Sequence, residues 1–175
     1  MTSVPLGSAA VAWRPRAATR RSSLELAVNP ATVRIARHWA AKLLAESELS
    51  RDEDIIDTVV LLVSELVTNA IDAMRELPAC PRSASPIPVP SAYTAPTSPV
   101  AKPRVWLAIA GSAEVVRIEV HDSTRVPVPA NCHRDDDEES GRGLEVVSAL
   151  ASDWGWAPEP LGKVVWCELL VSGSP

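Results

Sequence analysis

Apolar and polar positions follow one another along the chain in two different spacings, which predict strands and helices. Over 23–28 the two kinds of residue alternate, which predicts a short strand that Asn29 and Pro30 end. Over 33–49 apolar residues recur at helical spacing instead. We expect a helix there, with Asn29 as its N-cap and Pro30 in its first turn.

The strongest helical pattern of the chain covers 54–76. Ser50 followed by Glu53 has the pattern of a capping box before it, and Pro78 cannot continue a helix after it. The apolar residues share one stripe of this helix: Ile55, Val59, Leu62, Leu66 and Ala70. We therefore expect a long amphipathic helix with one face in the core.

The segment 78–103 has no apolar periodicity and holds half of the 16 prolines of the chain. We expect an extended linker that interrupts a single domain spanning 23–171. Two β-rich runs follow at 105–110 and 115–121, joined by a turn that contains glycine, which predicts a hairpin.

The rest of the chain reads as an irregular stretch, a helix over 143–151 and two closing strands over 153–157 and 163–171. The helices are gathered in the sequence and do not alternate with every strand. This order predicts an α+β fold with a mixed or antiparallel sheet, and it argues against a doubly wound parallel one.

The chain carries 17 basic and 22 acidic residues, which gives a net charge of −5. The acidic excess is concentrated in the unbroken run 135–139. Because phosphate-rich partners require a surplus of basic groups, we expect no direct binding to nucleic acid or to an anionic membrane. No apolar run approaches the ~20 residues of a membrane span.

Three scattered cysteines, Cys80, Cys132 and Cys167, share no metal-binding spacing with any histidine. An odd and sparse set of this kind is typical of free thiols in a reducing compartment. Residues 1–22 carry arginine but no acid and no apolar export segment, which indicates a basic disordered tail. We therefore expect a cytoplasmic protein.

Candidate chemistry begins on the helix 54–76. Glu65 and Asn69 are one turn apart and share a helix face with Asp72, away from the apolar stripe. A carboxylate can take the proton of an attacking hydroxyl or water, and an amide oxygen is a ligand suited to Mg²⁺. The plain alternative is a solvated polar face without chemistry.

Asp122 follows the strand 115–121. Because a carboxylate only accepts hydrogen bonds, it matches the exocyclic amine of adenine and repels the carbonyl of guanine. The plain alternative is an ordinary turn acid.

Gly141, Arg142 and Gly143 open the helix 143–151. The two glycines let the backbone approach a phosphate, the helix N-terminus offers free N–H groups, and Arg142 adds a charge-assisted contact. A tight turn is the alternative. Neither the P-loop nor the dinucleotide-binding glycine pattern occurs in the chain.

Taken in order, these three elements resemble the N, G1 and G2 boxes of the GHKL ATPase superfamily, which includes gyrase, histidine kinases and MutL. Three strings are closer still to one branch, the anti-sigma-factor serine/threonine kinases of the stand-alone actinobacterial type. They are Ser-Glu-Leu-Val-Thr-Asn-Ala at 64–70, Glu-Ser-Gly-Arg-Gly-Leu at 139–144 and Gly-Lys-Val-Val-Trp at 162–166. The resemblance covers roughly residues 23–171.

The resemblance implies a two-layer α/β sandwich of the Bergerat type, with a mixed, mostly antiparallel sheet and a lid over 123–140. It implies ATP and Mg²⁺ as cofactors, with Glu65 as the general base, Asn69 as the metal ligand and Asp122 as the adenine contact. The phosphates would be cradled by Gly141, Arg142, Gly143 and Leu144. As partners it implies a sigma factor and a protein antagonist phosphorylated on serine, and it suggests a homodimer.

Two positions depart from the pattern of this branch. The G1 box, 122–127, contains no glycine, and Val164 stands where the family has a threonine that supports adenine recognition, so we expect weaker adenine binding. Two functions stay open: a serine/threonine kinase, and a non-catalytic interaction module with a degenerate ATP site. A histidine kinase is disfavoured because the 175 residues show no helical dimerisation domain with a phosphoacceptor histidine.

Overall fold

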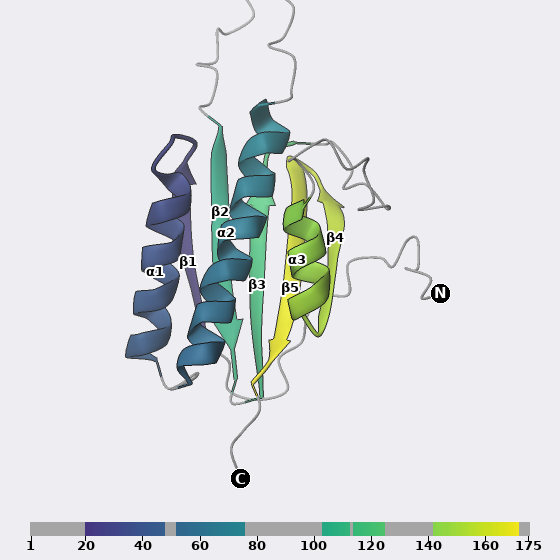
Figure 1. Cartoon of the computed structure of the whole chain (residues 1–175). Coiled ribbons are helices and arrows are strands. Elements are labelled where there is room, and N and C mark those ends of the chain that lie inside the picture. Colours follow the sequence, from purple (N-terminus) through teal and green to yellow (C-terminus); the bar gives the residue numbers. More distant parts are fainter. Residues whose placement is uncertain (1–19, 48–51, 76–102, 113, 125–141, 172–175) are drawn as a thin grey trace, which may run out of the picture.

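The structure is a computed structural model that describes residues 20–47, 52–75, 103–112, 114–124 and 142–171. These residues form two layers, with all the helices on one face of a single sheet (Figure 1). The elements in chain order are β1 (Arg20–Ala27), α1 (Thr32–Glu46), α2 (Glu53–Arg75), β2 (Arg104–Gly111), β3 (Val115–Asp122), α3 (Arg142–Leu150), β4 (Asp153–Glu159) and β5 (Gly162–Leu170).

The five strands lie in the order β1-β2-β3-β5-β4, and every neighbouring pair is antiparallel. The α+β fold predicted from the order of the elements and the two layers implied by the family resemblance are confirmed (Figure 1). Of the mixed and antiparallel sheets that the sequence left open, the described residues form the antiparallel one. β5 lies between β3 and β4 in the sheet and runs antiparallel to β3. The C-terminal end of β3 is therefore next to the start of β5.

The hydrophobic core lies between α2 and the central strands. On α2 the fully buried side chains form a wide stripe, because this helix contacts α1, α3 and the sheet at once. Its members are Val59, Leu62, Val63, Leu66 and Val67. The core residues of β2 and β3 are Val105, Leu107, Ile109, Val116, Ile118 and Val120. The predicted stripe is confirmed along most of its length, and Ile55 is only partly buried.

The starts of the first two helices are fixed by short-range hydrogen bonds. Asn29 Oδ1 accepts a bond of 2.8 Å from the backbone N–H two residues on, and Thr32 Oγ1 accepts one of 2.9 Å from the Asn29 N–H. Asn29 therefore closes the turn before α1 and is not the N-cap itself. At α2, Asp52 Oδ1 accepts a bond of 3.0 Å from the Asp54 N–H; the predicted cap Ser50 lies outside the described residues.

The start of the N-terminal strand shifts from the predicted residue 23 to Arg20. β1 begins at Arg20, because Arg20, Arg21 and Ser22 pair in register with β2. The predicted tail 1–22 therefore overlaps the strand, and the rest of that tail lies outside the described residues. The predicted linker 78–103 and the predicted lid 123–140 also lie outside the described residues, except for Pro103, Ser123 and Thr124.

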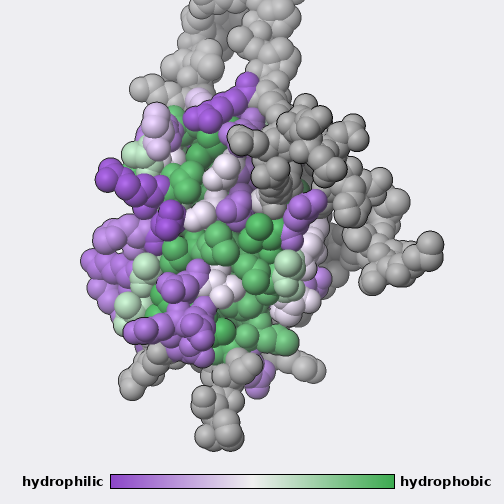
Figure 2. All heavy atoms as spheres, in the orientation of Figure 1, coloured by the Kyte–Doolittle hydropathy of each residue, from purple (hydrophilic) through white to green (hydrophobic). Residues whose placement is uncertain are grey.

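The helix-covered face is unevenly apolar. Figure 2 shows hydrophilic side chains over the α1 side of this face and hydrophobic ones toward its middle. Leu61 on α2 and Leu150 on α3 remain 41% and 40% exposed. The layer of helices thus leaves some apolar surface uncovered by the described part of the chain.

The opposite face of the sheet carries a network of charged side chains. Arg117, Glu119 and His121 alternate along β3 with the core residues, so they point away from the helices. Arg117 donates hydrogen bonds to Glu119 at 2.8 Å and to Glu168 at 2.7 Å, and its guanidinium lies 4.1 Å from the centre of the Trp166 ring. Trp166 therefore packs on a buried cation and not in the core.

This network lowers the pKa of Glu119 and raises the pKa of His121. The His121 ring and then the Arg117 guanidinium lower the pKa of Glu119 to about 2, against the effect of burial. The carboxylate of Glu119, 3.9 Å from Nε2, and that of Glu159, 3.1 Å from Nδ1, raise the pKa of His121 above 6.5. Protonated His121 thus joins the end of β3 to the end of β4.

We expect His121→Gln to reduce stability in a pH-dependent way. Because the folded protein raises the pKa of His121, the stabilisation is complete below 6.5 and is lost as the pH rises through the folded-state pKa. The difference in unfolding free energy between the two proteins should be largest near pH 6 and smaller at about pH 9. Urea unfolding at several pH values measures it, and a difference that grows with pH would contradict the prediction.

Candidate functional site

The chemistry predicted from the sequence gathers on the helix side of the sheet. α2 lies over β3 and beside α3, and Figure 1 shows both helices in front of β3 and β5. At the end of this region Ser123, just after β3, contacts Met74 near the end of α2, with Oγ and Sδ 3.6 Å apart. The last residues of β3 therefore lie at the C-terminal end of α2.

Asp122, the last residue of β3, is the centre of a buried polar cluster. Its Oδ1 accepts hydrogen bonds from the Thr124 N–H at 2.7 Å and from the Thr124 hydroxyl at 2.5 Å. Lys163 Nζ lies 3.3 Å from Oδ1, 3.0 Å from Oδ2 and 2.5 Å from Thr124 Oγ1. Asp122 is 5% exposed and Lys163 2% exposed. Burial of a carboxylate becomes tolerable here because an ammonium group is buried with it.

One oxygen of this cluster is incompletely satisfied. The contact of Asp122 Oδ2 with Lys163 is an ion pair without the geometry of a hydrogen bond, and Oδ2 accepts no other. A buried acceptor without a donor is costly unless something supplies the donor. The exocyclic amine of adenine is a donor of the required kind, so the residues fit the predicted adenine contact.

The pairing of β3 with β5 explains why Lys163 belongs to the cluster. Asp122 is directly opposite Lys163, whereas Val164 is opposite His121. Since neighbouring residues of a strand point to opposite faces, Val164 lies on the face away from Asp122. The expectation that a missing hydroxyl at Val164 weakens adenine recognition is therefore wrong, and the position that matters on the site's face is Lys163.

Gly162 allows β3 and β5 to come this close. A Cβ placed on Gly162 would lie 1.8 Å from the carbonyl oxygen of Asp122 and 2.9 Å from the Cα of Ser123. Both are backbone atoms and cannot turn aside as a side chain does. Only glycine fits at this position.

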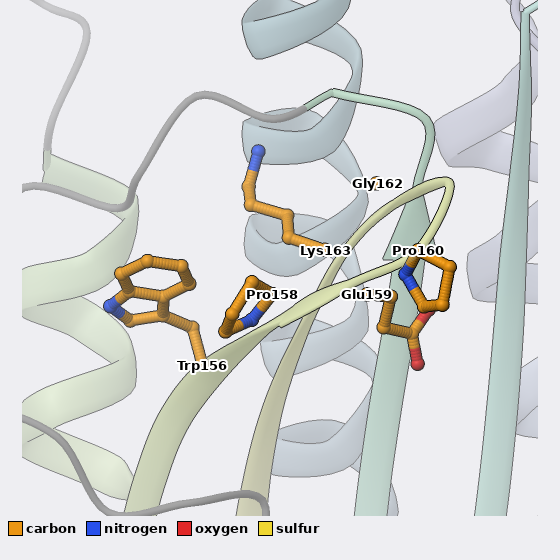
Figure 3. A pocket seen from close by; sticks show the side chains of 6 residues that line it. All are labelled: Trp156, Pro158, Glu159, Pro160, Gly162 and Lys163. Atoms are coloured by element: carbon orange, nitrogen blue, oxygen red, sulfur yellow. The ribbon is translucent and has the colours of Figure 1, made fainter.

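A cavity of ≈ 360 Å³ opens beside the cluster. Its walls come from the end of β4, the turn after it and the start of β5: Trp156, Pro158, Glu159, Pro160, Gly162 and Lys163. Figure 3 shows that Trp156, Pro158 and Lys163 present their side chains from the two paired strands. Lys163 thus belongs both to this cavity and to the Asp122 cluster.

Glu65 and Asn69 lie in the middle of α2, as predicted, and both are half-buried beside the fully buried stripe. They are one helical turn apart on the same face. Asp72, the third member of this face, forms an exposed ion pair of 3.4 Å with Arg75. Of the three polar residues, Asp72 is thus the one engaged by a neighbouring charge on its own helix.

The start of α3 meets the side chain of Glu65. A Cβ placed on Gly143 would lie 2.7 Å from Glu65 Oε2, so the glycine leaves room for the carboxylate. Leu144, predicted among the phosphate contacts, buries its side chain in the core and is 7% exposed, which leaves only its backbone for a ligand. Arg142 is the first residue of α3, and Gly141 lies outside the described residues.

Metal binding by protein groups alone is not supported in the described part of the chain, where no cluster of three or more histidine, cysteine or acidic side chains is found. Mg²⁺ differs from other metals in keeping several waters and taking one or two protein ligands together with phosphates. The half-buried amide of Asn69 on the same face as Glu65 is compatible with that mode.

Comparison with known families agrees with this arrangement. The chain matches the histidine kinase-like ATPase domain over residues 26–168, from β1 to β5. The protein therefore belongs to this family of GHKL-type ATPase domains, and membership implies ATP binding. A comparison with curated proteins gives no match.

No helix among the described residues is long and apolar enough to cross a membrane. Cys167 is 0% exposed, and burial raises the pKa of its thiol to about 12. It lies in the core and takes no part in the site.

Sequence reasoning missed the partners of Asp122. In the sequence, Lys163 belongs only to the family-like string 162–166, and Thr124 only to the G1 box 122–127. A signal was present, because Lys163 follows Gly162 at the start of a predicted strand and carries the charge opposite to that of Asp122. The pairing could not be read, since the register of two strands far apart in sequence is set by the folded sheet.

We expect Gly162→Ala to destabilise the protein by about 1–3 kcal/mol or more, because the added methyl group collides with the backbone of β3. Gly143→Ala is the matched control. There the methyl group meets only the flexible end of Glu65, and alanine is favoured in a helix by up to ~1 kcal/mol. Urea unfolding of both variants tests the difference, and equal stability of the two would contradict it.

Proposed function

We propose that this protein is a serine/threonine protein kinase that uses Mg-ATP to phosphorylate a serine of a protein antagonist, and that it binds a sigma factor. Membership of the histidine kinase-like ATPase family supports the binding of ATP. The resemblance of the string at 64–70 to anti-sigma-factor kinases supports a sigma factor and a protein antagonist as the partners. We expect it to act in the cytoplasm, without direct contact to nucleic acid or membrane.

The observation that carries the kinase proposal is the contact between Glu65 and the first turn of α3. The N-terminus of a helix is the preferred place for a phosphate group, because its free N–H groups point outward and its dipole is positive there. A carboxylate beside that turn is therefore close to where a terminal phosphate is held. Gly143 leaves the space that keeps Glu65 there.

In this proposal Glu65 accepts the proton of the substrate serine hydroxyl. The serine oxygen forms a bond to the terminal phosphorus, and the bond from that phosphorus to the leaving diphosphate oxygen breaks. The proton moves from the serine oxygen to the Glu65 carboxylate, and the products are phosphoserine and ADP.

Two other residues orient the nucleotide. Asn69, one turn along α2 from Glu65, supplies its amide oxygen to Mg²⁺, which neutralises charge on the phosphates when bound. Asp122 Oδ2, the oxygen that lacks a hydrogen bond in the cluster, accepts a hydrogen bond from the adenine amine. The two ends of the nucleotide are thus fixed by α2 and by the end of β3.

We expect Glu65→Gln to slow phosphate transfer to the antagonist by about 10²- to 10⁴-fold, because an amide cannot take the proton. Affinity for Mg-ATP should stay the same, since Glu65 acts on the attacking group. Asp57→Asn is the control, because Asp57 is an exposed carboxylate on the same helix. Labelled ATP and candidate antagonist proteins provide the assay, and calorimetry gives the affinity.

Transfer at the normal rate in Glu65→Gln would refute the assignment of the base. In the calorimetric arm, Asn69→Ala should weaken binding of Mg-ATP far more than Asp57→Asn does. If the unmodified protein binds no Mg-ATP at all, the kinase proposal fails. The alternative, a non-catalytic interaction module whose Asp122 is held permanently by Lys163 and Thr124, then explains the cluster better.

A further inference from the structure

The first strand of the sheet has a free edge in the described part of the chain. β1 pairs with β2 on one side, and no described strand lies on its other side. Just after β1, the Val28 N–H donates a hydrogen bond of 3.4 Å to the Pro103 carbonyl, just before β2. Because hydrogen-bonding directions alternate along a strand, the even-numbered residues of β1 direct their backbone groups at β2 and the odd-numbered ones direct theirs outward. The Ala27 carbonyl agrees with this, because it accepts hydrogen bonds from the Asn29 and Thr32 side chains, which belong to no strand.

The outward backbone groups in the middle of β1 belong to Arg21, Ser23 and Glu25, and all three residues are exposed. An edge of this kind can accept another strand, and charged side chains normally oppose that pairing. Here the charges are self-complementary, because Arg21 and Glu25 stand two residues on either side of Ser23 and are opposite in sign. A second copy of the strand, antiparallel and centred on Ser23, places Arg21 of each copy directly opposite Glu25 of the other.

We propose that two copies of this chain join through the outer edges of their β1 strands, about a twofold axis at Ser23. The Ser23 residues of the two copies exchange both of their outward backbone hydrogen bonds, and each pairing of Arg21 with Glu25 exchanges two more. Since both copies use the same surface, the contact is isologous and closes at two copies. The two five-stranded sheets become one continuous antiparallel sheet, with the helices of both copies on the same face.

The charged side chains at this edge have bonding capacity left. The Arg21 side chain is 56% exposed and reaches Glu119 with one nitrogen, at 2.8 Å. The Glu25 side chain is 41% exposed, and Arg104 binds one of its oxygens. An arginine has five N–H donors, and a carboxylate accepts at both oxygens. The pairing therefore adds an ion pair on either side of Ser23 and breaks neither of the existing ones.

Neighbouring registers of the same two strands lack this match. A shift of the axis by one residue puts Arg21 opposite Ala27 in one direction and opposite Ser23 in the other. In neither register does a charge meet its opposite directly. Because opposite charges directly across two strands attract each other, charge complementarity selects the register centred on Ser23.

Sedimentation equilibrium of the full chain, at several protein concentrations and without nucleotide, measures the association. We expect the mean mass to rise from that of one chain to that of two as the concentration increases. Ser23→Pro should prevent the rise, because proline has no N–H to offer a second copy. It should leave the fold intact, since the lost N–H points away from β2 and an edge strand tolerates proline there. Ser23→Ala keeps the N–H and is the matched control, which should dimerise as the unmodified chain does.

Charge reversal tests the register by itself. We expect Arg21→Glu and Glu25→Arg each to weaken dimerisation by about 10- to 100-fold, because both ion pairs of the dimer become contacts between like charges. An equimolar mixture of the two variants should dimerise again, since both contacts of a mixed dimer join opposite charges. Arg75→Glu is the control. Arg75 is also an exposed arginine in an ion pair, with a side chain 62% exposed, but it lies at the end of α2.

Every outcome decides the proposal. The mass of a single chain at all concentrations up to about 1 mM, where even weak dimers are populated, refutes it. A dimer that persists in Ser23→Pro and in both charge variants uses another surface and also refutes it. Charge variants that fail alone and recover as a mixture support the register, whereas a mixture that stays monomeric contradicts it.

If Ser23→Pro does not fold, the mixture of charge variants decides alone, because misfolding of one variant cannot imitate recovery by the other. The proposal rests on β1 and not on the nucleotide site. Binding of Mg-ATP is measured separately, so the proposed kinase and the proposed dimer can fail independently of each other.

Discussion

The antiparallel pairing of β3 with β5 is the constraint on which the site depends. It places Asp122 directly opposite Lys163 on the face that the helices cover, and it brings the Asp122 carbonyl so close to β5 that only Gly162 fits. The ion pair and the approach of the two backbones have the same origin. A slip of one residue would turn Lys163 to the other face and leave a buried carboxylate without its counterion.

α2 serves the core and the site at once, and its sequence shows how. Its fully buried residues contact the sheet, α1 and α3, while Glu65 and Asn69 lie half-buried at the edge of that stripe, with Glu65 beside the start of α3. Because the core fixes the rotation of α2, it also fixes the direction of Glu65. On the other face, the charge network of Arg117, Glu119 and His121 joins β3 to Glu168 of β5 and to Glu159 of β4 without using the core.

Much of this arrangement could be predicted, for particular reasons. The helix at 54–76 was predicted within one residue at each end, because a long apolar stripe has only one periodic interpretation. The caps and strand ends were less accurate. Asn29 closes a turn instead of capping α1, and β1 starts at Arg20, because pairing with β2 outweighs the polar character of those residues. The sequence could not show that Val164 lies on the face away from Asp122, since its side depends on strand register.

The sequence by itself determined the class of fold, the family-like order of Glu65, Asn69, Asp122 and the glycines, and the amphipathic helix that carries the first two. These follow from local periodicity and spacing, which each segment contains in full. Only the tertiary structure decided that Lys163 and Thr124 surround Asp122, and that Gly143 makes room for Glu65. Such contacts join residues distant in the chain, and their geometry exists only once the strands have paired and the helices have packed on the sheet.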